Sequence, residues 1–134
     1  MKLNSEVDVI KYLKKNWDSV FPNFRNVQFE TSVVGWHSDK TIGHVDITFS
    51  YRGSRYACEA KFTSASAVGD LWDSTKVLAY CAALKIKTGQ SYKPCVLLPK
   101  KTITTDTLPI LGKLNLNYIV FTRDDNGIMF EYLL

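Results

Sequence analysis

The segment that decides the fold runs from residue 43 to residue 62 and reads GHVDITFSYRGSRYACEAKF. Apolar and polar side chains alternate from Val45 to Tyr51, which is the period-2 pattern of a half-buried β-strand. The dipeptide Arg52-Gly53 then suits a two-residue turn, and a second apolar run follows it. The segment therefore predicts a β-hairpin in which Tyr51 pairs with Ser54.

This register sorts the hairpin side chains onto two faces. Counting back from the turn, the register pairs Phe49 with Tyr56 and Asp46 with Glu59. The expected polar face carries His44, Asp46, Thr48, Ala57, Glu59 and Lys61, with His44 opposite Lys61. The expected apolar face carries Val45, Ile47, Phe49, Tyr51, Tyr56, Cys58 and Ala60. A shift of one residue would mix the two sets, so the pattern fixes the register.

The register places two carboxylates, those of Asp46 and Glu59, directly across from each other at about 5 Å between Cβ atoms. Like charges in this position are destabilising, so the pair indicates a cation between them. Carboxylates and the nearby Ala60 carbonyl suit Mg²⁺ or Mn²⁺. Lys61 points to the same side as Glu59, where an ammonium can orient or deprotonate a water. The set predicts phosphodiester hydrolysis, and an ion-pair ladder on a wet sheet face is the alternative interpretation.

The same residues carry a family resemblance. Gly43-His44-Val45-Asp46, followed by Glu59-Ala60-Lys61, resembles the PD-(D/E)xK nuclease superfamily, with features of RecB-type nucleases and of archaeal Holliday-junction resolvases. His44 and Val45 stand where the name-giving Pro would precede the Asp. The resemblance implies a restriction-endonuclease-like fold, an Mg²⁺ (or Mn²⁺) cofactor held by Asp46, Glu59 and the Ala60 carbonyl, and Lys61 as the third catalytic residue. It also implies DNA as the substrate and 5′-phosphate products. Many small relatives are homodimers, and a nuclease module within a larger assembly is the alternative.

A third acidic metal ligand has two candidates. Glu6 lies in the first turn of an amphipathic helix expected over residues 4–17, and related nucleases often bring an acid from this helix to the metal. Glu30 lies in a strand expected over residues 27–34 and is the rival candidate. The sequence leaves both open.

Three further residues are candidates for contact with nucleic acid. Lys76 and Tyr80 share one face of a helix expected over residues 66–87, and their spacing matches the Gln-x-x-x-Tyr of RecB-type nucleases with Lys in place of Gln. That departure weakens assignment to the RecB branch, and pairing with Asp73 is the alternative for Lys76. His44, beside Asp46, is the third candidate.

The remaining pattern completes an α/β chain that we expect to form a single nuclease-like domain over residues 1–134. The first helix should have an apolar stripe of Val9, Ile10, Leu13 and Trp17. The second should end at Gly89 and pack on the sheet through Val68, Leu71, Trp72, Leu78, Cys81, Ala82 and Ile86. A strand at 93–98 follows the second helix and should run parallel to the Glu59 strand. The last expected elements are a short helix or turn at 106–114, broken at Pro109, and strands at 118–122 and 128–133. The order predicts a mixed central β-sheet flanked by helices, with an α-β-β-β-α-β core and a C-terminal β-hairpin.

Composition sets the broad class. The 134 residues are 46% hydrophobic and carry a net charge of +4, which permits a polyanionic partner. No apolar run reaches membrane-spanning length and no signal peptide opens the chain, so we expect a cytoplasmic protein. The cysteines, Cys58, Cys81 and Cys95, lack the close spacing of a zinc site. The alternative function is a catalytically inactive nuclease-fold subunit that binds nucleic acid or a protein partner.

Overall fold

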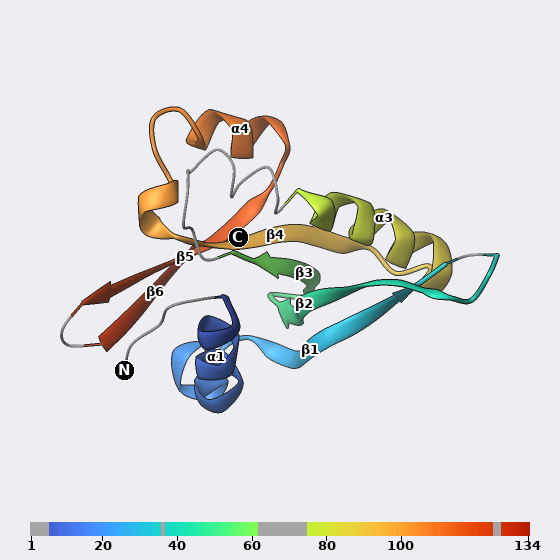
Figure 1. Ribbon diagram of the computed structural model, residues 1–134, viewed down its shortest axis with the longest axis horizontal. Helices are drawn as coiled ribbons and strands as arrows, with labels where there is room; N and C mark the ends of the chain where they lie inside the picture. Colours follow the sequence, from blue (N-terminus) through green and yellow to red (C-terminus); the bar gives the residue numbers. More distant parts are fainter. Residues whose placement is uncertain (1–5, 36, 62–74, 125–126) are drawn as a thin grey trace.

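The computed structural model describes residues 6–35, 37–61, 75–124 and 127–134 (Figure 1). The elements in chain order are α1 (Glu6–Val20), β1 (Arg25–Val34), β2 (Thr41–Tyr51), β3 (Ser54–Ala60), α3 (Lys76–Thr88), β4 (Tyr92–Pro99), the 3-10 helix η1 (Lys100–Thr102), α4 (Leu108–Lys113), β5 (Asn117–Asp124) and β6 (Gly127–Leu133). This order confirms the predicted α/β class.

All six strands form one mixed sheet in the order β1-β2-β3-β4-β5-β6. β3, β4 and β5 run parallel to one another, and the other neighbours are antiparallel. The predicted hairpin register is confirmed at Tyr51–Ser54 and Phe49–Tyr56. Arg52 and Gly53 have φ values of 50° and 79°, and positive φ at both turn residues matches the twist of a two-residue hairpin.

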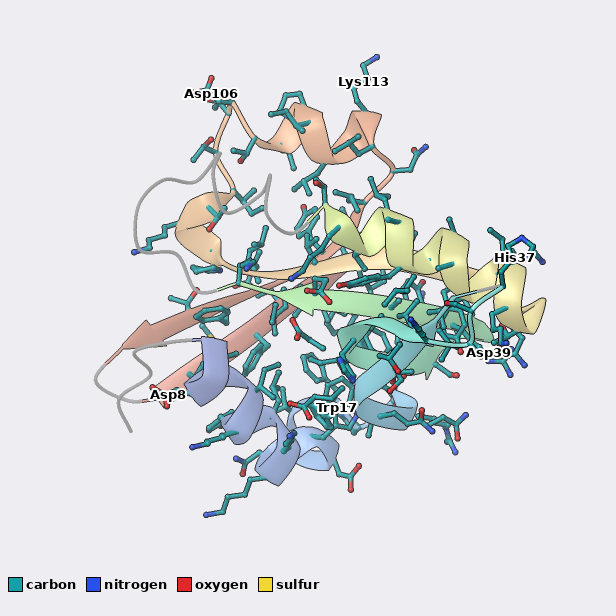
Figure 2. All side chains as sticks on the ribbon, turned by 45° about the vertical axis from the view of Figure 1, so that its right-hand side comes forward. Asp8, Trp17, His37, Asp39, Asp106 and Lys113 are labelled. Atoms are coloured by element: carbon teal, nitrogen blue, oxygen red, sulfur yellow. The ribbon has the colours of Figure 1, made fainter. Side chains whose placement is uncertain are left out.

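α1 covers one face of the sheet, and α3 and α4 cover the other (Figure 1). The predicted stripe on α1 is buried at Val9, Leu13 and Trp17. Trp17 reaches from α1 to the sheet (Figure 2), where its ring centroid lies 5.7 Å from that of Phe49. Burial of this aromatic side chain is one of the larger apolar contributions to the fold.

α3 begins at Lys76 and ends before Gly89, whose φ of 76° confirms the predicted glycine stop. Its predicted start and the expected contributions of Val68, Leu71, Trp72 and Asp73 fall on residues 62–74, outside the described residues. The predicted face of this helix is partly wrong. Val77 and Leu84 are buried, whereas Ile86 is 61% exposed and Ala82 is also exposed. Residues 77–84 are apolar all round apart from one tyrosine hydroxyl, so periodicity alone does not select the buried side.

The alternation in β2 breaks just before the hairpin core. Val45, expected on the same face as Ile47, packs instead with Ala57 and Val77 on the α3 side. Glu30 lies across from this break, between the pairs that join β1 to β2, and its φ is 56°. A left-handed residue turns the strand, and we attribute the change of face at Val45 to this twist.

The predicted strands after α3 are confirmed as β4, β5 and β6, and β4 runs parallel to β3 as expected, but the predicted break at Pro109 is wrong. Pro109 lies in the first turn of α4, where proline is tolerated, so it does not break that helix. An ion pair between Asp39 and Lys87 links the loop between β1 and β2 to the C-terminal end of α3. Figure 2 labels Asp39 in this loop. Across the part of the chain that the structure describes, we find no helix with the length and apolar character needed to span a membrane.

Candidate active site

Asp46 and Glu59 lie together where the backbone pairing of β2 and β3 stops. The described pairing runs from the turn to Ile47 and Cys58 and no further. Beyond it the carboxylates bond to the opposite strand. The Asp46 N–H donates to Glu59 Oε1 at 3.3 Å, and the Ala60 N–H donates to Asp46 Oδ2 at 2.8 Å. Each acidic side chain thus substitutes for a missing backbone bond, and both are held at the same level of the sheet.

The buried carboxylate is that of Glu59, which is 1% exposed. Burial, and then the negative charge of Asp46, raise the pKa of Glu59 to about 7, against the opposing effects of Lys76 and the Asp46 N–H. Lys76 Nζ lies 3.4 Å from Glu59 Oε2. Burial lowers the pKa of Lys76, but the charge of Glu59, its hydrogen bond and the charges of Tyr80 and Asp46 together outweigh burial, so the pKa of Lys76 is raised.

Lys76 and Tyr80, one turn apart on α3, face the two strands of the site. A Cβ atom built on Gly43 would lie 2.5 Å from Tyr80 Oη, so the ring packs directly on the Gly43 backbone. Lys76 contacts β3 through Glu59, and Tyr80 contacts β2 through Gly43. The sequence placed Lys76 near the site but did not identify Glu59 as its partner, because only folding brings these two residues together.

Lys61 follows β3 directly. Its N–H donates to the Leu97 carbonyl at 2.9 Å, which keeps the backbone beside β4, and its side chain is partly buried. The predicted pairing of His44 with Lys61 is not formed, because the described ladder between β2 and β3 stops at Ile47 and Cys58. On its other side, His44 pairs with Ser32 of β1. The carboxylate bonds of Asp46 and Glu59 end the ladder before His44 is reached. His44 is exposed.

The arrangement fits a divalent cation with a small set of protein ligands. One oxygen of each carboxylate accepts a backbone N–H, which leaves Asp46 Oδ1 and Glu59 Oε2 as the potential ligands. Mg²⁺ is usually held by one or two carboxylates and several waters. Among the described residues no group of three His, Cys, Asp or Glu side chains is placed to hold a metal ion, and Glu30 is exposed. Glu6 begins α1, and its side chain lies outside the described part.

Comparison with solved structures finds proteins whose overall fold is similar to that of this chain. A repair endonuclease from Pyrococcus abyssi matches with a TM-score of 0.58 and 18% identity over 88% of this chain and 47% of its own. An XisH family protein from Nostoc punctiforme PCC 73102 matches with a TM-score of 0.60 and 13% identity, over 93% of this chain and 98% of its own. An fdxN element excision controlling factor protein from Anabaena variabilis matches with a TM-score of 0.59 and 17% identity, over 96% of this chain and 98% of its own.

The chain therefore spans about half the length of the endonuclease and almost all of the other two proteins. No protein-family model and no curated protein matches the sequence. The predicted restriction-endonuclease-like fold is confirmed by these structural likenesses and by the mixed six-stranded sheet with helices on both faces.

Proposed function

We propose that the chain is a divalent-metal-dependent nuclease that hydrolyses phosphodiester bonds in DNA. The observation that carries the proposal is the pair formed by Asp46 and Glu59, whose carboxylates are fixed side by side by bonds to the opposite strand. The fold adds support, because one structural neighbour is a repair endonuclease. A net charge of +4 is compatible with a polyanionic substrate.

Each site residue has a role in this proposal. Asp46, Glu59 and the Ala60 carbonyl would hold Mg²⁺ or Mn²⁺, and the ion would supply positive charge for the attacking and leaving oxygens. Strand alternation directs Lys61 to the same side of the sheet as Glu59. Its ammonium orients the attacking water and stabilises the negative charge that develops on the phosphoryl oxygens. In-line attack by the water forms a new bond to phosphorus and breaks the bond to the 3′ oxygen. The proton of the water passes to solvent, the 3′ oxygen takes up a proton and leaves as a hydroxyl, and the product carries a 5′-phosphate, as the family resemblance implies.

The DNA contacts are assigned by exposure. His44 is exposed two residues before Asp46, and we keep it as a candidate phosphate contact. It alternates with Gly43 and Val45, which face α3, so we expect its side chain on the other face of the sheet. Tyr80 is half-buried against Gly43, so we assign it the positioning of α3 ahead of any contact with a base. A homodimer would let two such sites cut the two strands of a duplex, and light scattering of the purified protein tests that state directly.

A second candidate function is a nuclease-fold subunit that binds nucleic acid without cutting it. The Lys76 ammonium already supplies a positive charge to Glu59, so the site is partly neutralised by the protein itself. One structural neighbour is named for control of excision, and its name does not mention cleavage. This candidate predicts binding of DNA or RNA with no metal-dependent product.

Cleavage of labelled nucleic acid separates the two functions. The substrates are single-stranded DNA, duplex DNA, a four-way junction and RNA, each with Mg²⁺, Mn²⁺ or EDTA. We expect metal-dependent cutting of DNA that Lys61→Met slows by about 10²- to 10³-fold, the usual range for loss of one group that stabilises charge in the transition state. Lys113→Met removes an equal charge from the outer side of α4 (Figure 2) and should cut like the wild type. Binding in a gel shift without cutting would favour the second candidate, and neither binding nor cutting would refute both.

A further inference from the structure

Lys76 occupies an electrostatically unfavourable position. It is the first residue of α3, where the aligned peptide dipoles place partial positive charge and disfavour a cation. Its Nζ nevertheless lies 3.4 Å from Glu59 Oε2. The side chain of Glu59 is 2% exposed and that of Lys76 is 49% exposed. A buried carboxylate therefore holds a lysine that has water on its other side.

Both oxygens of Glu59 already have partners. Oε1 accepts the Asp46 N–H, and Oε2 is paired with Lys76. A divalent cation that takes Glu59 as a ligand needs Oε2, because Oε1 is fixed in the contact between the strands. A cation bound to Oε2 would lie next to the Lys76 ammonium, and the two positive charges would repel each other. The repulsion is strong beside a buried group, because the local dielectric constant is low. Binding of the cation thus requires Lys76 to leave.

The half-exposed lysine can leave at small cost. Its stem is flexible, and part of the side chain is already in water. α3 itself stays in place, because Tyr80 packs on Gly43 one turn further along the helix. Release of Lys76 therefore moves a side chain and leaves the two strands and the helix as they are.

We propose that Lys76 is a built-in counter-ion of Glu59 that competes with the divalent metal and sets the metal affinity of the site. This inference rests on the proposed function, since it assigns the metal to Asp46 and Glu59. In the absence of metal, Lys76 offsets the charge of a buried carboxylate beside a second one. When metal binds, the ammonium is displaced toward solvent, to which about half of the side chain is already exposed.

The test is Mn²⁺ binding to the whole protein, measured by titration calorimetry and by the loss of the free Mn²⁺ resonance signal. We expect Lys76→Met to lower the Kd for Mn²⁺ about five-fold, which corresponds to about 1 kcal/mol for a half-exposed ion pair. Lys76→Arg keeps the charge and should retain the wild-type Kd or weaken binding. Lys85→Met, which removes the same charge further along α3, where Lys85 Nζ donates to the Gly89 carbonyl, should leave the Kd unchanged.

Thermal unfolding of the same proteins gives a second readout. Removal of Lys76 leaves Glu59 without its cation, so Mn²⁺ should raise the Tm of Lys76→Met by more than it raises that of the wild type. A Kd for Lys76→Met equal to or higher than the wild-type value would overturn the inference and leave the nuclease proposal standing. If neither protein binds Mn²⁺, the inference falls together with the proposed metal site. Tighter binding by Lys76→Met without DNA cleavage by either protein would support the inference and refute the nuclease.

Discussion

The pKa of Glu59 gives a prediction about folding stability that does not depend on catalysis. Burial and the neighbouring Asp46 charge raise that pKa from 4.5 to about 7 in the native state. Between these pH values the native protein holds a proton that the unfolded chain has lost. The free energy of unfolding must then fall as the pH rises from about 4.5 to about 7, and it is level beyond both limits with respect to this group.

The size of the effect follows from the same two values. Each pH unit between them is worth 1.36 kcal/mol, so Glu59 should remove roughly 3 kcal/mol of stability between pH 4.5 and pH 8. That is a large share of the 5–15 kcal/mol typical of a small domain. Glu59→Gln has no charge to bury, and its amide oxygen can still accept the Asp46 N–H. The variant should therefore lose about 3 kcal/mol less than the wild type over this range.

Urea unfolding at pH 4.5 and pH 8, followed by tryptophan fluorescence, measures the difference. Other groups titrate in the same range, so the comparison between proteins is the informative quantity. Glu131→Gln is a matched control, because Glu131 is exposed and pairs with Lys100 on the surface. It should show the wild-type dependence on pH. The reasoning would be refuted if Glu59→Gln lost as much stability as the wild type and the control.

Three further outcomes are expected from the packing and the site. Trp17→Ala should lower the free energy of unfolding by about 3–5 kcal/mol in urea, because it empties a buried aromatic site; a loss below 1 kcal/mol would contradict this packing. Gly43→Ala should cost about 1–3 kcal/mol, because the new methyl group meets Tyr80, whereas Gly112→Ala, with open space around it, should cost nothing. Asp46→Asn should keep its bond to the Ala60 N–H and fold normally, yet lose the rise in Tm that Mn²⁺ gives the wild type; a retained shift would remove Asp46 from the metal site.

The hairpin and its acidic pair were predictable because they are local. A two-residue turn fixes every pair on both strands, so the positions of Asp46 and Glu59 follow from counting back from Arg52-Gly53. The register is insensitive to the rest of the chain as far as Ile47 and Cys58. The end of the ladder was not predictable, because it is set by side chains that bond to the backbone of the opposite strand.

Contacts made by α3 depended on tertiary structure. Its middle is almost uniformly apolar, so sequence spacing alone gave a wrong side for Ile86. The side of α3 that faces the sheet is the one on which Lys76 pairs with Glu59 and Tyr80 packs on Gly43. The left-handed Glu30, which accompanies the change of face at Val45, also has no local signal, since Glu is not a residue that favours positive φ.

Bonds between the strands hold the two carboxylates of the proposed metal site in place without help from a cation. Asp46 Oδ2 and Glu59 Oε1 are engaged with backbone N–H groups, so the carboxylates are positioned before any cation arrives. Two close carboxylates, one of them buried, still carry an electrostatic cost, and Lys76 offsets only part of it, since the pKa of Glu59 stays raised. A sequence selected for stability alone would place an uncharged residue at position 59. The proposed metal site would account for a charged residue at this position, because a bound cation needs the charge that destabilises the fold without it.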